Sequence, residues 1–490
     1  MTHKIRTRFA PSPTGFMHVG NLRSALYEYL VAKCQGGDFI LRIEDTDQER
    51  LVEGAIEHIY QTLAQVHLQH DEGPDIGGPF APYVQSQRLD HYLPYAQQLV
   101  KTGHAYYCFC SKERLASLES QADGLEGHQG YDRHCRDLSQ AEVEAKLAAG
   151  EPYVIRQKMP LTGTTSFQDD IFGEITVENK ELEDQILIKS DGFPTYNFAN
   201  VIDDHEMEIT HVVRGSEYLS STPKYNLLYQ AFGWTIPHYV HLPLILGQDG
   251  QKLSKRHGAT TFEALIQDGY LSEAIINYIA FLGWAPSKDE REIFSLEELV
   301  KAFSISGISK SPAVFDYAKL AWYNEQYIRQ MSEADFIAWV KPDLDEFFAG
   351  QNYDPQLLAS MLQSRLVKKS DIPQMLDFFK EPAAFDPQMY YHKRSKLVPE
   401  LAEKVLRHVL TKIETSDFSE EGLTGALKDL CQELDLKTGA IMNPIRIGLS
   451  GKQVTPGGSI ELLLLLGKAE SVKRLSQVVD LLAQYQAENK

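Results

Sequence analysis

The chain has 490 residues and carries 48 Lys and Arg against 68 Asp and Glu, a formal net charge of −20. The length predicts about three or four domains and excludes a single small module. A hydrophobic content of 43% with 24% charged residues excludes wholesale disorder, a collagen-like chain and a membrane protein. Taken alone, the acidic balance argues against a polyanionic partner.

The first 43 residues have the pattern of a strand, a helix and a second strand. Alternation over residues 5–9 predicts a strand, which the prolines and the glycine of residues 11–15 end. Apolar positions recur at helical spacing over residues 22–30, and residues 39–43 form a short apolar run typical of a buried parallel strand. This βαβ unit is the building block of a nucleotide-binding sheet.

A second set of α/β elements comes much later in the chain. Apolar runs at residues 185–189, 209–213 and 239–246 predict strands, and Ser221-Thr222-Pro223 predicts the start of a helix that ends near Gly233. The sheet is therefore expected in two halves with an insertion between them.

The pattern turns helical after Gly258. A capping box at Thr260 and Glu263 begins it, residues 272–282 predict an apolar helix, and no strand alternation returns after about residue 330. We expect an α/β fold with a Rossmann-like sheet, followed by an all-α half. The expected parts are residues 1–104 and 186–258 for the two halves of the sheet, 105–185 for the insertion, 259–330 for a first helical region, and 331–490 for the all-α region.

Other features of the sequence point to the cytoplasm. The first residues lack the apolar region of a secretory signal, and the longest apolar run, Leu462 to Leu466, is far shorter than the roughly 20 residues of a membrane-spanning helix. Five cysteines suit a reducing compartment better than a disulfide framework. We expect a cytoplasmic monomer that does not bind a membrane.

The loop between the first strand and the first helix is a candidate phosphate site, because ligands of open α/β sheets bind at such points. Gly15 and Gly20 allow close backbone approach, free amides at the helix start attract phosphate, and His18 can add a donor. The glycine spacing imitates a P-loop, but Asn21 and Leu22 stand where that motif needs Lys and Ser or Thr. A dinucleotide fingerprint is also absent from the sequence.

A basic loop, Lys252-Leu253-Ser254-Lys255-Arg256, follows a predicted strand and a turn. Its cations can neutralise the charge that builds on a departing pyrophosphate. Alone, a His before a helix is more often structural and a basic loop is usually solvated. Together and in this order, the two tracts resemble the HIGH and KMSKS signatures of class I aminoacyl-tRNA synthetases, with Asn21 in place of the second His.

Four further blocks narrow the resemblance. Residues 8–15 (RFAPSPTG), 41–47 (LRIEDTD), 191–197 (DGFPTYN) and 211–215 (HVVRG) resemble the glutamyl-tRNA synthetase family. The helical half is similar to the anticodon-binding region of bacterial members and unlike the β-barrels of glutaminyl enzymes. The resemblance implies a class I Rossmann-like catalytic domain in residues 1–104 and 186–258 and a connecting, acceptor-binding insertion in residues 105–185. It also implies stem contact by residues 259–330 and anticodon binding by residues 331–490. The alternatives are a glutaminyl-tRNA synthetase, a small-molecule nucleotidyltransferase of the same superfamily, and a non-catalytic tRNA-binding protein.

The resemblance implies a ligase that uses ATP with Mg²⁺ to convert L-glutamate into glutamyl-adenylate and pyrophosphate, and then transfers glutamate to the 3′ end of tRNA-Glu. No base is needed in the first step, because the substrate α-carboxylate is the nucleophile. A tRNA partner is compatible with the acidic total if basic groups line a local groove. The implied catalytic residues are His18, Lys252 and Lys255, and the implied ATP-binding residues are Thr14, Gly15, His18, Gly20, Asn21, Lys252, Ser254 and Lys255.

A pocket for glutamate needs cations for two carboxylates and an anion for the ammonium. By resemblance, Arg8 and Arg214 bind the carboxylates and Glu44 meets the ammonium. Two simpler roles stay open: Glu44 could cap a strand end, and Arg214 could form a surface ion pair. The implied glutamate-binding residues are Arg8, Ser12, Glu44, Tyr196, Asn200 and Arg214.

Three cysteines of the insertion form a candidate metal site. Some family members hold a zinc ion there with three Cys and a His two residues after the third. In this chain Asp137 occupies that position, and a carboxylate can also bind Zn²⁺. One CxC with a distant Cys is a weaker signal than two CxxC pairs. The candidate ligands of a structural Zn²⁺ are Cys108, Cys110, Cys135 and Asp137, with His134 or His128 as substitutes for Asp137.

Overall fold

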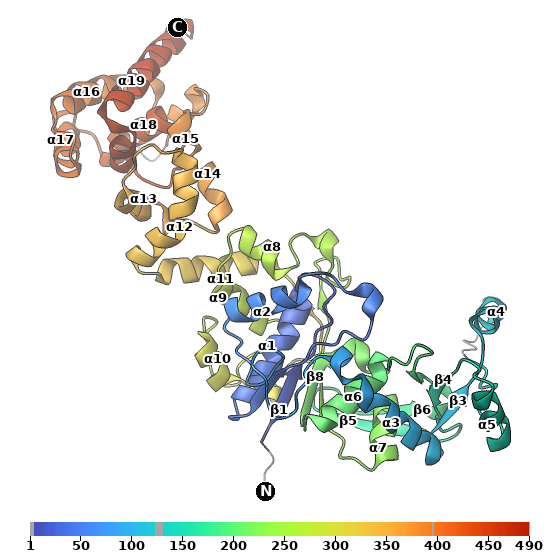
Figure 1. Ribbon diagram of the computed structural model, residues 1–490. Coiled ribbons are helices and arrows are strands. Elements are labelled where there is room, and N and C mark those ends of the chain that lie inside the picture. The colour runs from blue at the N-terminus through green and yellow to red at the C-terminus, as the bar shows by residue number, and fades with distance from the viewer. Residues whose placement is uncertain (1–3, 123–130, 394–395, 490) are drawn as a thin grey trace. The chain divides into compact units, whose positions relative to one another are not determined.

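The computed structural model describes residues 4–122, 131–393 and 396–489, and it contains two compact units (Figure 1). The first unit comprises Met1–Gln267 and Ser272–Tyr317, and the second comprises Asp268–Leu271 and Ala318–Lys490. Every strand of the described residues lies in the first unit. The α/β catalytic part and the helical carboxy-terminal part expected from the sequence are both confirmed.

The α/β core begins with β1 (Arg6–Phe9), α1 (Val19–Lys33) and β2 (Asp38–Leu41). β1 and β2 pair in parallel with Arg6 opposite Asp38, and α1 buries its apolar face on them. Thr210 donates its backbone N–H to the Arg6 carbonyl at 3.0 Å, which brings β8 (His211–Gly215) alongside β1. The predicted βαβ unit therefore forms as expected.

The predicted insertion contributes two strands to the catalytic sheet. β5 (Thr164–Asp169) and β6 (Gly173–Glu178) extend a sheet whose order is β6-β5-β9-β8, where β9 is His238–Leu242. β8 and β9 are parallel, and β5 pairs with β9 at Asp169 and Tyr239. The remaining sheet of this region consists of β3 (Ala105–Cys108), β4 (Val154–Gln157) and β7 (Ile186–Ile188).

Helices cover these sheets and carry much of the site. α6 (Tyr196–Glu206) and α7 (Thr222–Phe232) share one apolar core with β7 and with α3 (Leu89–Lys101). The capping box expected at Thr260 is not formed, because the cap of α8 (Phe262–Gln267) is Thr261, whose hydroxyl accepts from the Ala264 amide at 3.3 Å. The other elements of this unit are α2 (Ala55–Gln65), α4 (Lys112–Ala122), α5 (Gln140–Ala148), β10 (Ile245–Leu246), α9 (Ser272–Ala280), α10 (Leu296–Ala302) and β11 (Ala313–Val314).

The second unit is helical throughout its described residues. α11 (Tyr317–Gln330) leads into it, and α16 (Pro399–Thr415) packs on α18 (Thr438–Ser450) and α19 (Ser459–Glu488). Gly467, at φ +75°, interrupts α19 with a conformation that favours glycine. The remaining helices are α12 (Glu333–Phe348), α13 (Pro355–Leu362), α14 (Ile372–Met375), α15 (Asp377–Lys380) and α17 (Glu420–Glu433).

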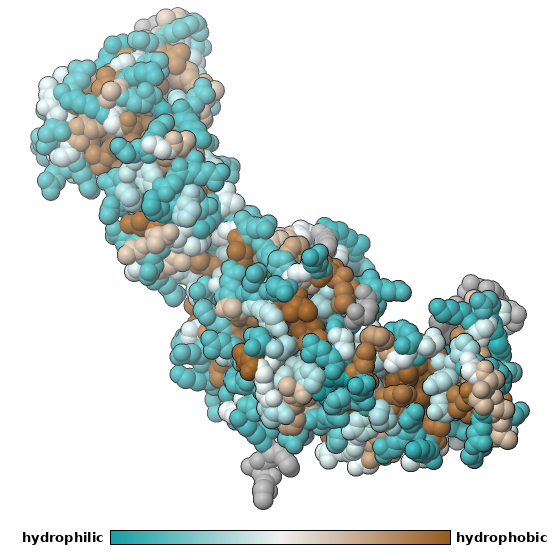
Figure 2. Space-filling model, viewed as in Figure 1, coloured by the Kyte–Doolittle hydropathy of each residue, from teal (hydrophilic) through white to brown (hydrophobic). Residues whose placement is uncertain are grey.

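On the face that Figure 2 shows, hydrophilic residues predominate and apolar residues form separate patches among them. Among the described residues, no helix combines the length and the apolar character that crossing a membrane requires.

Candidate active site

A cavity of about 300 Å³ brings together many of the residues expected from the sequence. It lies where β1 and β8 end, against the start of α1 and the start of α6. Gly15, Glu44, Asn200 and Ser254 do not line it. The expected site residues that line the cavity are Arg8, Ser12, Thr14, His18, Gly20, Asn21, Tyr196, Arg214 and Lys252.

Hydrogen bonds already occupy the backbone amides at the start of α1. His18 is the N-cap of the helix, and its Nδ1 accepts from the Gly20 amide at 3.1 Å. The Val19 amide donates to the Thr260 carbonyl, and the Asn21 amide donates to the His18 carbonyl. The expectation of free amides at the helix start is therefore wrong for this structure. Gly15, in the same loop, has a φ of +133°, a conformation that L side chains rarely adopt.

The basic loop is fixed at both ends. Leu253 is buried and donates its amide to the Ile245 carbonyl, while the Ser254 amide donates to Nδ1 of His257 at 3.0 Å. His257 in turn lies 3.1 Å from an Asp249 oxygen. Lys252 lines the cavity with a side chain that is 66% exposed, 3.6 Å from Glu217. The backbone of Lys255 follows in a short 3-10 helix, Lys255–His257. The structure does not describe the side chain of Lys255.

Arg214 is buried at the cavity and makes no ion pair with a carboxylate among the described residues. Its Nε donates to Nε2 of His241 at 3.2 Å, and its Nη2 donates to the Thr222 hydroxyl at 2.9 Å. The guanidinium carbon lies 4.7 Å from the ring centre of Tyr225 and 5.1 Å from that of Tyr218. The alternative that Arg214 forms a surface ion pair is wrong, because its side chain is buried.

Behind Arg214 stands a pair of groups that sequence reasoning missed. Nδ1 of His241 and a carboxylate oxygen of Asp169 are 2.6 Å apart, and both side chains are fully buried. Asp169 also accepts the amides of Ile171 and Phe172. These bonds hold Asp169 at the end of β5, so the strand from the insertion supports the arginine of the pocket.

Arg8 is also buried, but carboxylates of the protein already contact it. Its Nε donates to Asp204 at 2.9 Å, and its Nη1 lies 3.4 Å from Glu28. Burial opposes ionisation of Asp204, yet Arg8 and Arg42 hold the pKa of its carboxyl below the usual value. Burial raises the pKa of Glu28 well above the usual value, with Arg8 opposing. Burial thus disfavours the charged form of Glu28, and Arg8 and Arg42 both contact Asp204.

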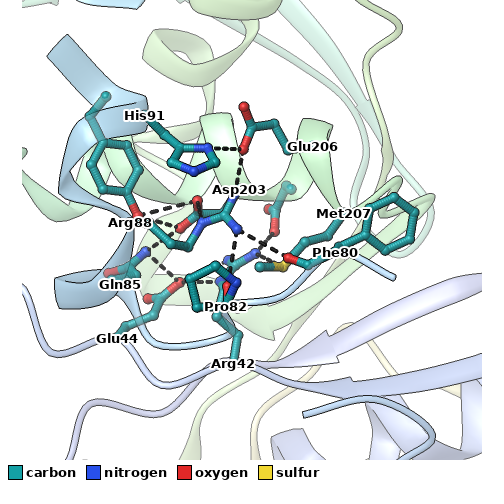
Figure 3. Close-up of polar contacts among 12 residues, drawn as sticks. Arg42, Glu44, Phe80, Pro82, Gln85, Arg88, His91, Asp203, Glu206 and Met207 are labelled. Carbon is teal, nitrogen blue, oxygen red and sulfur yellow. Dashed lines mark hydrogen bonds and ion pairs between the residues drawn. The ribbon is translucent and has the colours of Figure 1, made fainter. Parts of the chain in front are cut away.

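Glu44 belongs to a buried network behind the cavity (Figure 3). Arg42 donates to one oxygen of Glu44 at 2.8 Å from Nη2, and the other oxygen of Glu44 has no hydrogen-bond partner among the described residues. Gln85 and Arg88 both donate to Asp203, at 2.9 and 2.8 Å. Because Asp203 and Asp204 are on α6, the network fixes the helix that carries the remaining pocket residues.

α6 presents two of the expected residues. Tyr196 is its first residue and lines the cavity, and Asn200, one turn later, is 2% exposed. The spacing of four places both side chains on one face of the helix. Ser254 lies in the basic loop, with its hydroxyl 3.2 Å from Nδ1 of His257.

A second cavity of about 900 Å³ adjoins the first, since Tyr196 lines both. It runs past residues 108–115 and 152–156 of the insertion and past Lys189 and Asp191. Its lining mixes aromatic side chains such as Tyr153 with basic ones such as Arg156.

The three cysteines of the insertion meet as expected. Their sulfur atoms all lie within 4.8 Å of one another, and Sγ of Cys110 is 3.6 Å from Sγ of Cys135. The hydroxyl of Tyr131 is 3.2 Å from Sγ of Cys108 and 3.9 Å from Sγ of Cys110. Asp137 is not part of this cluster: its side chain is 90% exposed and 4.0 Å from Lys158. His134 is not part of the cluster either, and His128 lies outside the described residues.

Comparisons with known proteins agree with this geometry. Residues 4–322 match the family model of tRNA synthetases class I (E and Q), catalytic domain, and residues 303–479 match an anticodon binding domain. The chain is 54% identical over 481 residues to a glutamate–tRNA ligase of Clostridium botulinum strain Hall, covering 98% of this chain and 99% of the relative. It is 55% identical over 487 residues to that of Lachnoclostridium phytofermentans, with the same coverage.

A crystal structure of a glutamate tRNA ligase from Elizabethkingia meningosepticum, in complex with its amino acid, superposes with a TM-score of 0.87. The two chains are 38% identical, and the match covers 98% of this chain and 100% of the other. The chain therefore belongs to the glutamate–tRNA ligase family of the class I tRNA synthetases.

Proposed function

We propose that this protein activates L-glutamate with ATP and transfers the glutamyl group to the 3′ end of tRNA-Glu. The observation that carries the proposal is Arg214, a buried guanidinium without a carboxylate partner among the described residues, in the same cavity as His18 and Lys252. One carboxylate of the substrate would form an ion pair with Arg214. Its other carboxylate would then lie near the loop before α1, where the ATP phosphates are proposed to bind.

In the first step the substrate α-carboxylate attacks the α-phosphorus of ATP, forming the adenylate and releasing pyrophosphate. His18, Lys252 and Lys255 act by positioning the phosphates and by stabilising the charge of the leaving group. Mg²⁺ enters with ATP and neutralises phosphate oxygens when bound. The residues proposed to bind ATP are Thr14, Gly15, His18, Gly20, Asn21, Lys252, Ser254 and Lys255.

Glutamate recognition is proposed to depend on two arginines, Arg8 and Arg214, which differ in whether a carboxylate of the protein already contacts them. Arg214 has no carboxylate partner in the described protein, so the substrate carboxylate is proposed to be its ionic partner. Arg8 shares Asp204 with Arg42, and its remaining positive charge is proposed to attract the other substrate carboxylate. Glu44 lies behind the cavity, and its carboxylate is proposed to supply the negative charge that the ammonium needs. The proposed glutamate-binding set is Arg8, Ser12, Glu44, Tyr196, Asn200 and Arg214.

For the second step we propose that the 3′ end of tRNA enters through the larger cavity. Aromatic and basic side chains such as Tyr153 and Arg156 suit a single-stranded nucleotide, and the cavity shares Tyr196 with the smaller one. Asp47, Glu49 and Asp191 also line it. The 2′-hydroxyl of the terminal adenosine then attacks the adenylate. In this assignment residues 105–185 bind the acceptor end between catalytic halves 1–104 and 186–258, residues 259–330 contact the stem, and residues 331–490 bind the anticodon.

We also propose that the cysteine cluster binds one structural Zn²⁺. Three free thiols within 4.8 Å are a donor set that zinc favours, and the Tyr131 hydroxyl, rather than Asp137, is beside them. Zinc would join β3 to the turn at Cys135 and so brace the insertion. A cytoplasmic location and a monomeric state remain proposals from the sequence.

Pyrophosphate exchange, measured with tRNA-Glu present, tests the function. We expect exchange with L-glutamate, and slower exchange with L-glutamine by a factor of about 10⁴, because a site built for a charged oxygen rejects the uncharged isostere. Equal rates with the two amino acids would favour a glutaminyl enzyme. Exchange without any tRNA binding in a filter assay would favour a nucleotidyltransferase for small molecules.

A further inference from the structure

A cluster of metal-ligating side chains lies outside the active site. Donor atoms of Asp170, His211 and His238 all lie within 4.8 Å of one another. His211 and His238 are register partners on the parallel strands β8 and β9, and their rings stack with centres 4.7 Å apart. Asp170 directly follows β5 on the other side of β9, where its amide donates to the Tyr239 carbonyl at 2.9 Å. Three adjacent strands therefore present the three side chains.

The cluster is on the opposite face of the sheet from the glutamate pocket. Side chains alternate between the faces of a strand, so residues three apart point to opposite sides. His211 and Arg214 are three apart on β8, His238 and His241 are three apart on β9, and Asp170 follows Asp169 directly. The Asp169–His241–Arg214 chain thus faces the pocket, and the second set faces away from it.

We propose that Asp170, His211 and His238 form a surface site for a divalent transition-metal ion, with Zn²⁺ as the expected occupant. Two imidazoles and one carboxylate suit Zn²⁺, whereas Mg²⁺ prefers oxygen ligands alone. Three ligands from the protein leave a fourth position for water or for a ligand from solution.

Supporting contacts already orient the ligands. The Thr210 hydroxyl accepts from the Arg6 amide at 2.9 Å and lies 2.9 Å from Nδ1 of His211, which leaves Nε2 of His211 as the ligating atom. Nδ1 of His238 is 3.9 Å from a carboxylate oxygen of Asp170. The His238 side chain is 66% exposed, so it can rotate off the His211 ring and shorten these separations to those of a Zn²⁺ site.

Zinc titration of the full-length chain against a chromophoric chelator tests the site. The Cys108→Ser/Cys110→Ser background removes two of the three clustered thiols and leaves Cys135 without its partners, so that the cysteine cluster no longer offers a zinc site. In that background we expect one zinc site per chain, and at least a tenfold weaker affinity after His238→Ala or Asp170→Asn. Replacing the exposed His238 leaves the sheet core unchanged. The matched control is His70→Ala, which removes an imidazole that faces a single carboxylate, Asp75, at 2.7 Å.

A second readout does not depend on affinity. Zinc should raise the thermal midpoint of the background protein and of His70→Ala, and should leave that of His238→Ala unmoved. Co²⁺ bound to the background protein should show d–d absorption without thiolate charge transfer. The proposal is overturned if the background binds no zinc, or if His238→Ala and His70→Ala bind it equally.

Discussion

Nε of Arg214 donates to Nε2 of His241 at 3.2 Å, so the imidazole must accept at that nitrogen. Its proton is then on Nδ1, which donates to Asp169 at 2.6 Å. Burial lowers the pKa of His241, with Asp169 opposing, which favours this neutral form. Asp169 thus selects the tautomer that aims Arg214, although neither Asp169 nor His241 lines the cavity.

His241→Phe should therefore impair glutamate binding without impairing ATP binding. The ring keeps its volume but loses the acceptor, and one lost hydrogen bond to a charged group is worth about 1.5–3 kcal/mol. We expect the KM for glutamate to rise about tenfold or more, with the KM for ATP unchanged, in pyrophosphate exchange. Asp169→Asn should act in the same direction. Equal changes in both KM values would show that His241 supports the whole site and does not aim Arg214.

His241 should also make stability fall in mild acid. Its folded pKa is lowered, so below about pH 6.5 the unfolded chain binds a proton that the folded imidazole refuses, and the free energy of unfolding decreases as pH falls. The thermal midpoint of the wild-type protein should drop between pH 7 and pH 5.5 by more than that of His241→Phe. Glu28, whose pKa is raised, acts in the opposite direction, but it is common to both proteins. Parallel pH curves would contradict the assignment.

Lys252→Ala and Lys255→Ala should slow adenylate formation more than they weaken glutamate binding. Charge builds on pyrophosphate only as it departs, so a cation that stabilises it affects the rate more than substrate affinity. Single-turnover adenylate formation at saturating glutamate should fall about 10²-fold or more. The control is Arg291→Ala, an exposed arginine paired with Asp289 and Glu298 that does not line the cavity. An unchanged rate in either lysine variant would remove that lysine from the transition state.

At the cysteine cluster, substitutions can distinguish Tyr131 from Asp137 as the fourth ligand of Zn²⁺. If Zn²⁺ binds with Tyr131 beside the thiols, Cys108→Ser should abolish binding at this site and Tyr131→Phe should weaken it. Asp137→Asn should leave it unchanged, since that carboxylate is 90% exposed and outside the cluster. Metal analysis in the His238→Ala background isolates this site. Loss of zinc in Asp137→Asn would instead support the ligand expected from the sequence.

Local patterns predicted those parts of the molecule that depend on neighbours in sequence. The strand, loop and helix of residues 5–33 follow from alternation, prolines and helical spacing, and they place Arg8 and His18 at the cavity. The pairing of β5 with β9 joins residues about 70 apart and left no local signal. For the same reason the sequence revealed Arg8 but not Asp204, which is 196 residues away.

The contrast between Arg8 and Arg214 leads to different outcomes for two similar substitutions. Arg214 has no ion pair among the described residues, so Arg214→Ala should lower kcat/KM for glutamate about 10²-fold or more. It also removes two hydrogen bonds, to His241 and Thr222, but leaves no buried carboxylate without its cation, so the thermal midpoint should fall less than in Arg8→Ala. Arg8→Ala should also impair glutamate use, but it leaves Asp204 buried with Arg42 as its remaining cation, and breaking such a pair costs about 3–5 kcal/mol. Its thermal midpoint should therefore fall, and Arg8→Lys should restore part of it. Equal losses of stability in the two alanine variants would contradict this difference between a paired and an unpaired arginine.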